Sequence, residues 1–173
     1  MHRVWALLAA AGLLFAVTAR ASDSSLSPAA NAAFVAQSAN QPGTVVRPSG
    51  LQYRIIRSGF GKKPQPLDSV SVNYKGSLIN GKVFDSTEPG FPAMMKVNEV
   101  IPGWTEALEL MREGDHWQLV IPANLAYGER GAGDGTIPPN QTLVFDLELL
   151  TVTPAPPEPK KDDQDSSSGG ASQ

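Results

Sequence analysis

The 173 residues include 14 Lys and Arg against 17 Asp and Glu, which gives a formal charge of -3, and the chain has no Cys. This charge argues against a nucleic-acid-binding protein, because such binding rests on Lys and Arg that neutralise phosphates. Without Cys there is no disulfide, and two His alone cannot assemble a zinc site of the usual His/Cys type. We expect a core held by packing alone.

Residues 1–21 have the pattern of a secretory signal peptide. A basic start precedes an apolar run, Trp5 to Val17, that is shorter than the ~20 residues a membrane span needs. Ala19-Arg20-Ala21 has the small residues of a cleavage site. We expect cleavage after Ala21, a periplasmic or secreted product and no stable membrane insertion. An uncleaved N-terminal anchor is the alternative.

Residues 22–48 form a polar, Ala-rich arm with one short predicted helix. Ser27 is placed as its N-cap and Pro28 in its first turn, and Pro42-Gly43 would stop it. The helix carries few apolar side chains. We therefore expect it to lie on the surface or to fray.

Residues 49–153 are the predicted folded domain, and strands dominate it. Apolar and polar residues alternate over several short segments, as in strands with one buried face. Asn80-Gly81 is a hairpin signal, followed by a short returning strand. The predicted strands centre on Leu51 to Ile55, Val70 to Tyr74, Val83 to Asp85, Trp117 to Ile121 and Leu143 to Leu149.

One amphipathic helix is predicted from Trp104. Ala107, Leu108 and Met111 follow at i+3, i+4 and i+7, which places them on one face. Pro102 lies near the first turn and Gly114 supplies a stop. Five to six antiparallel strands with a single helix indicate an α+β fold, in which the helix covers one face of the sheet. Residues 154–173 are too rich in Pro, Ser and Gly to form a core and are expected to be disordered.

The segment Val100-Ile101-Pro102-Gly103-Trp104 is the strongest pointer to a binding site. A Trp that opens a helix can form the floor of a pocket, with the preceding backbone as its rim. Gly-rich and Pro-rich loops flank this region, and binding residues favour such loops. Aromatic side chains at these spacings are also typical of a core, so the residues alone indicate only an apolar pocket. Its candidate residues are Tyr74, Phe84, Asp85, Phe91, Val100, Ile101, Trp104, Tyr127, Ile137 and Phe145.

Conventional catalytic chemistry finds little support in the chain. After removal of the leader, His116 is the only imidazole, and no Gly-x-Ser-x-Gly motif is present. The glycines at 59 and 61 lack the spacing of a phosphate loop. Asp85 is open to two interpretations, a surface charge or a buried acceptor that orients a ligand or a neighbouring Tyr.

Six motifs together resemble the FKBP-type peptidyl-prolyl isomerases, in the family's order and at close to its spacing. The approach through Phe34-Val35-Ala36 and Pro48 to Tyr53 is similar to the secreted bacterial, macrophage infectivity potentiator-like branch. The resemblance covers the motif core, residues 67–153. The motifs are Val72 to Gly76, Gly81 to Ser86, Val100 to Trp104, Ala126 to Gly128, Ile137 to Asn140 and Leu143 to Asp146.

The resemblance implies a curved sheet of five to six strands wrapped around one short helix, and a cleft with assigned roles. Trp104 would be the floor beneath a proline ring, while Tyr127 and the Ile101 backbone would hold carbonyl groups of the peptide. The implied catalytic residues are Tyr74, Phe84, Asp85, Trp104, Tyr127 and Phe145. The implied substrate-binding residues are Phe91, Val100, Ile101 and Ile137.

The implied function is acceleration of X-Pro bond rotation in folding secreted proteins. It requires no cofactor and no metal. The partners would be proline-containing polypeptides, and macrolide immunosuppressant inhibitors of the family are expected to bind. Only about 27 residues separate the leader from the domain, fewer than the long helical region of dimeric members, so we expect a monomer. The alternative function is a chaperone or peptide-binding module with weak or no isomerase activity.

Overall fold

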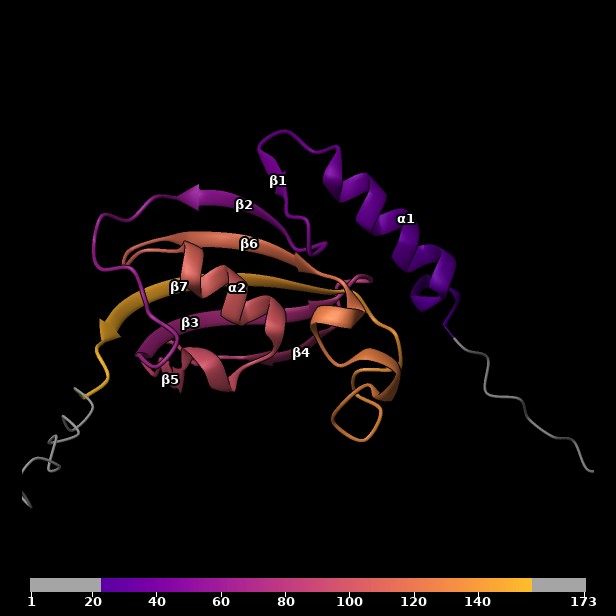
Figure 1. Ribbon diagram of the computed structural model, residues 1–173. Helices are drawn as coiled ribbons and strands as arrows, with labels where there is room; N and C mark the ends of the chain where they lie inside the picture. Colours follow the sequence, from indigo (N-terminus) through magenta and orange to yellow (C-terminus); the bar gives the residue numbers. More distant parts are fainter. Residues whose placement is uncertain (1–22, 157–173) are drawn as a thin grey trace, which may run out of the picture.

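A computed structural model describes residues 23–156 (Figure 1). The predicted signal peptide, residues 1–21, and most of the predicted tail, residues 157–173, lie outside the described residues. Within residues 23–156, no helix is both long enough and apolar enough to cross a membrane.

One curved antiparallel sheet organises the protein, with α2 lying across one face (Figure 1). Its strands follow the order β1-β2-β6-β7-β3-β4, and β5 also pairs with β3. The helices are α1 (Pro28–Ala39) and α2 (Pro102–Leu110). The strands are β1 (Thr44–Val46), β2 (Gln52–Arg57), β3 (Ser69–Leu78), β4 (Val83–Ser86), β5 (Ala93–Lys96), β6 (His116–Ile121) and β7 (Leu143–Thr153).

The core lies between α2 and the face of the sheet that α2 covers. The long central strands β3 and β7 pair over ten positions, and both alternate buried apolar residues with more exposed ones. From α2, Trp104, Ala107 and Leu108 are buried against them. This packing sets the position of the N-terminal turn of α2 over the middle of the sheet.

The α+β class and the antiparallel sheet around a short helix are confirmed. The sheet has seven strands, however, where the sequence predicted five or six, and a second helix, α1, packs on it. Strand β1 has three residues and β5 has four, which is too short to display an alternating pattern. Both form because longer neighbours, β2 and β3, offer them a partner edge.

Helix α1 begins as predicted, with the Ser27 hydroxyl accepting a hydrogen bond from the backbone N–H of Ala30. Only Asn31 and Ser38 of its residues are buried, so α1 lies on the surface, one of the two expected outcomes. Gln52 points away from α2, and its side chain donates to the carbonyl of Val35 in α1. Helix α1 therefore packs against the sheet face opposite to α2, and β1 extends the sheet into the arm predicted as residues 22–48.

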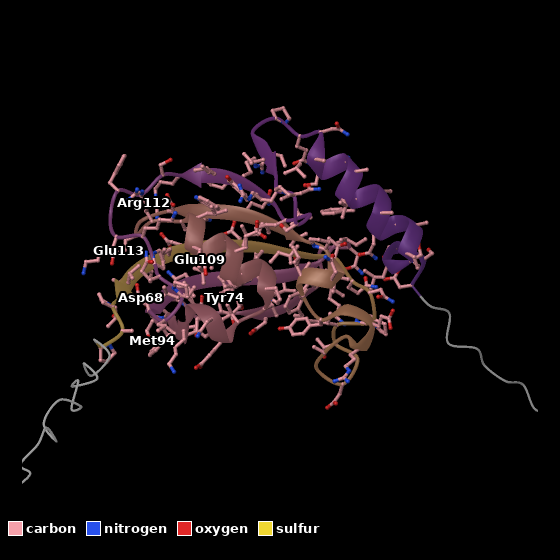
Figure 2. All side chains as sticks on the ribbon, in the orientation of Figure 1. Asp68, Tyr74, Met94, Glu109, Arg112 and Glu113 are labelled. Carbon is pink, nitrogen blue, oxygen red and sulfur yellow. The ribbon has the colours of Figure 1, made fainter. Side chains whose placement is uncertain are left out.

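Two carboxyl side chains, Asp68 and Glu113, fix the end of the sheet where β7 leaves the fold (Figure 2). Asp68 accepts the backbone N–H groups of Gln65 and Ala155. Glu113 accepts those of Lys62 and Val152. These contacts tie the loop between β2 and β3 to the end of β7.

Replacing Glu113 with Gln is expected to lower the urea midpoint at pH 7, because one carboxyl oxygen becomes an N–H donor that faces a donor. The hydrogen bond from Val152, followed by that from Lys62, lowers the pKa of Glu113 below its ordinary 4.5. A lowered pKa stabilises the fold above pH 4.5, and this contribution disappears as the pH falls through the lowered pKa. The difference in urea midpoint between wild type and Glu113→Gln should therefore disappear as the pH is lowered. Glu109→Gln is the matched control, since Glu109 makes no side-chain hydrogen bond within residues 23–156. A difference in urea midpoint that does not change with pH would contradict a stabilising role of the Glu113 carboxylate.

Candidate active site

A cleft of about 430 Å³ opens between the N-terminal end of α2 and the sheet. Strands β3, β4, β5 and β7 supply one side, and the segment that leads into α2 supplies the other. The loop before β7 contributes a single tyrosine at the rim. The lining residues are Tyr74, Phe84, Asp85, Met95, Glu99, Val100, Ile101, Trp104, Tyr127 and Phe145.

A β-bulge lets two consecutive residues of β4 reach this cleft. Side chains of a regular strand alternate between faces, so Phe84 and Asp85 would normally point apart. The pairing of β3 with β4 shifts register between Gly76 and Ser77, and a bulge of this kind redirects side chains. Phe84 then packs on Phe145 while Asp85 stays beside Tyr74.

Trp104 and Phe145 form the dry base of the cleft. Each is 4% exposed, and their rings meet edge to face with centroids 5.2 Å apart. Tyr74 makes a similar edge contact with Trp104 at 5.1 Å. The Trp104 Nε1–H is buried and meets no acceptor among the described residues, so this base presents aromatic surface to a ligand.

The start of α2 presents a backbone donor to the cleft. Pro102 occupies the first turn, where its missing N–H costs no hydrogen bond. The Ile101 carbonyl accepts from the N–H groups of Trp104 and Thr105. The Ile101 N–H donates to no group within residues 23–156, and Ile101 is one of the residues that line the cleft. A carbonyl of a bound ligand can accept from it.

Tyr74 and Asp85 are the polar pair of the cleft. The Tyr74 hydroxyl donates to the Asp85 carboxyl oxygen at 2.6 Å. Burial, followed by this hydrogen bond, raises the pKa of Tyr74 to about 12. Burial and the nearby Asp85 also raise the pKa of Tyr127. Both phenols therefore remain protonated donors at neutral pH. Asp85 has a part of each interpretation: its side chain is exposed, as a surface charge would be, and it accepts a hydrogen bond that orients Tyr74.

Most of the predicted site residues gather in the cleft, but two do not. Phe91 is 76% exposed and is absent from the lining. Ile137 is 6% exposed and belongs to the core. Met95 and Glu99 line the cleft without having been predicted. Their only signal in the sequence was their position shortly before Val100, because the brief strand β5 gave no pattern that would orient them.

The cleft offers neither an imidazole nor a cluster of metal ligands. His116 alternates with the core residue Trp117 along β6, and so it lies on the other face, where its ring contacts Asp146 at 2.7 Å. Within the part of the chain that the structure describes, no three His, Cys, Asp or Glu side chains gather to hold a metal ion. The arrangement can bind an apolar group and two or three carbonyls.

Comparison with known proteins identifies this architecture. The family model described as FKBP-type peptidyl-prolyl cis-trans isomerase matches residues 61–150, half of the chain. The chain belongs to this family. The predicted family is thereby confirmed, and with it the resemblance to the macrophage infectivity potentiator-like branch.

Two curated relatives extend the similarity beyond the family model. The chain is 54% identical over 124 residues to the "Outer membrane protein MIP" of Legionella longbeachae, covering 71% of this chain and 53% of the relative. It is 52% identical over 120 residues to the "FKBP-type 22 kDa peptidyl-prolyl cis-trans isomerase" of Escherichia coli strain K12, covering 69% and 58%. The chain thus spans little more than half the length of these relatives.

A solved structure shares the fold over nearly its whole length. The peptidyl-prolyl cis-trans isomerase of Pseudomonas syringae superposes with a TM-score of 0.68 at 39% identity. The match covers 73% of this chain and 92% of that one.

Proposed function

We propose that this protein is a peptidyl-prolyl cis-trans isomerase that accelerates X-Pro bond rotation in folding proteins outside the cytoplasm. The observation that carries the proposal is the dry aromatic cleft, with the Tyr74–Asp85 pair and the available Ile101 N–H on its walls. Membership of the isomerase family supports the same reaction.

The chemistry needs no bond to break. Resonance opposes rotation of a peptide bond by ~18–20 kcal/mol, so X-Pro bonds interconvert over tens to hundreds of seconds. The twisted amide loses resonance, and its carbonyl becomes less polar. An apolar cleft therefore disfavours the twisted state less than it disfavours the planar states. Raising the rate about 10⁴-fold requires only ~5–6 kcal/mol of preferential stabilisation.

The proposed roles follow the geometry of the cleft. Trp104 lies under the proline ring, and Phe145 closes the cleft beside it. The Ile101 N–H and the Tyr127 hydroxyl hold carbonyls on either side of the rotating bond. Because these donors are fixed by α2 and by the loop before β7, the peptide does not have to order them when it binds.

The proposal extends to location and partners. Proline-containing polypeptides are the proposed substrates, and macrolide inhibitors of the family are proposed to compete for the same cleft. Export by residues 1–21 would place the protein in the periplasm or medium, and the similarity to an outer membrane protein supports that placement. The monomeric state stays a prediction.

The deciding measurement is isomerisation of a short Leu-Pro peptide by the full chain. At micromolar enzyme we expect an observed isomerisation rate at least about a hundredfold above the uncatalysed rate, and loss of most of this acceleration in Phe145→Ala. His116→Ala is the control, because its side chain lies on the opposite face and should leave the rate unchanged. A folded wild-type protein that gives no acceleration would refute the proposal and favour a binding module.

A further inference from the structure

A single asparagine attaches α1 to the segment that precedes β7. Asn31 lies in the first turns of α1 and is 6% exposed. Its Oδ1 accepts the backbone N–H of Thr142 at 2.7 Å, and its Nδ2 donates to the Gln141 side chain at 3.1 Å. The same Nδ2 lies near the carbonyls of Leu26 and Ser27, so every polar atom of the amide is satisfied.

This attachment continues to the rim of the cleft through the backbone. Gln141 also donates to the carbonyl of Pro139, which closes the turn at the end of the loop. Between them, Asn140 has a left-handed backbone with φ of 59°. Its N–H donates to the carbonyl of Gly128 at 2.8 Å, and Gly128 directly follows Tyr127. The base of the loop that carries Tyr127 is thus held by residues that Asn31 fixes.

We propose that Asn31 is a positioning residue, through which helix α1 on one face of the sheet fixes the Tyr127 rim of the cleft on the other. Tyr127 itself is 40% exposed, and the core holds only part of its side chain. Its placement therefore depends on the base of its loop. A left-handed Asn140 is a conformation that non-glycine residues adopt at a cost, and it persists where surrounding contacts impose it.

If Asn31 served only to hold α1 on the sheet, removing another buried amide that holds α1 should have the same effect on activity. Gln52 is also a buried amide, 2% exposed, and it donates to the Val35 carbonyl of α1. Gln52 lies on β2, and its side-chain hydrogen bond does not involve the Tyr127 loop. Gln52→Ala is therefore the matched control, because it removes a buried amide that binds α1 and leaves the loop base intact.

The first test is kinetic and rests on the proposed function. In the full chain, Asn31→Ala should lower kcat/KM by about threefold to tenfold, whereas Gln52→Ala should lower only the urea midpoint. In a Tyr127→Phe background, the added loss from Asn31→Ala should shrink, because the hydroxyl that it positions is gone. Equal kinetic effects of Asn31→Ala and Gln52→Ala, or fully additive losses with Tyr127→Phe, would overturn the proposal.

The second test does not depend on activity. Amide hydrogen exchange should be faster at Asn140 in Asn31→Ala than in wild type, and unchanged there in Gln52→Ala. Asn140 is the informative site because its N–H bonds to Gly128 and not to Asn31. Unchanged exchange at Asn140 would refute the coupling even if isomerase activity is found. Faster exchange in an inactive protein would refute the proposed function and retain the positioning role.

Discussion

Replacing Asp85 with Leu is expected to lower kcat/KM for X-Pro peptides by roughly tenfold to 150-fold. The Tyr74 hydroxyl donates to the exposed Asp85 carboxylate at 2.6 Å in the lining of the cleft. Hydrogen bonds to charged groups contribute about 1.5–3 kcal/mol, and each 1.4 kcal/mol is tenfold in rate. Leu has the same branching but accepts no hydrogen bond, so Tyr74 loses both its partner and its fixed orientation beside Trp104.

Asp85→Asn is the matched variant for this prediction. Its amide oxygen can still accept from Tyr74, so its activity should fall between those of wild type and Asp85→Leu. Tyr74→Phe should in turn reduce the effect of Asp85→Leu, since the pair acts through one hydrogen bond. Peptide isomerisation assays on wild type, the three single variants and the double variant Tyr74→Phe/Asp85→Leu, with urea midpoints measured in parallel, separate lost chemistry from lost stability. Full activity in Asp85→Leu would exclude a catalytic contribution from this pair.

The central strands and α2 were readable from the sequence because their patterns are local. Along β7, every second residue from Leu143 to Leu149 is buried, as the alternation predicted. Helix α2 carries Pro102 at its start and a buried stripe at helical spacing. In both cases the burial pattern repeats within the element itself.

The remaining features depend on contacts between distant residues. The bulge that turns Phe84 and Asp85 to the same side arises from pairing with β3, and alternation within β4 alone would separate them. The Asn31 side chain accepts a hydrogen bond from the backbone of Thr142, which lies 111 positions later in the chain. The resemblance to the family implied that Phe91 binds substrate, but in the structure its side chain is exposed and lies outside the cleft lining. No periodicity within a segment encodes any of these outcomes.

The packing of the cleft leaves no room for a Cβ atom at Gly76, and Gly76→Ala is expected to damage the site while keeping the fold. Gly76 lies on β3 opposite both Phe145 on β7 and Asp85 on β4. A Cβ atom there would come within 2.7 Å of Phe145 Cε1 and within 2.7 Å of Phe84 Cζ. Distances under 3 Å force these atoms to move.

The added Cβ atom meets the aromatic rings of Phe84 and Phe145, which can rotate away while the backbone stays in place. They cannot turn independently, however, because Phe84 contacts Phe145 edge to face at 5.7 Å, and Phe145 contacts Trp104 in the same way. We expect a stability loss of about 1–3 kcal/mol, as for other overpacked sites. We also expect a larger proportional loss in kcat/KM, because the displaced rings are the walls that exclude water.

Ser77→Ala is the control for Gly76→Ala, since Ser77 is the next residue of β3 and belongs to the groove on the opposite face of the sheet. It should leave kcat/KM unchanged. Urea unfolding, near-ultraviolet circular dichroism and the peptide assay on both variants distinguish the outcomes. A Gly76→Ala protein with wild-type activity and an altered aromatic spectrum would mean that ring placement does not limit the reaction. The activity of the cleft would then have to be attributed to Trp104 and the start of α2 alone.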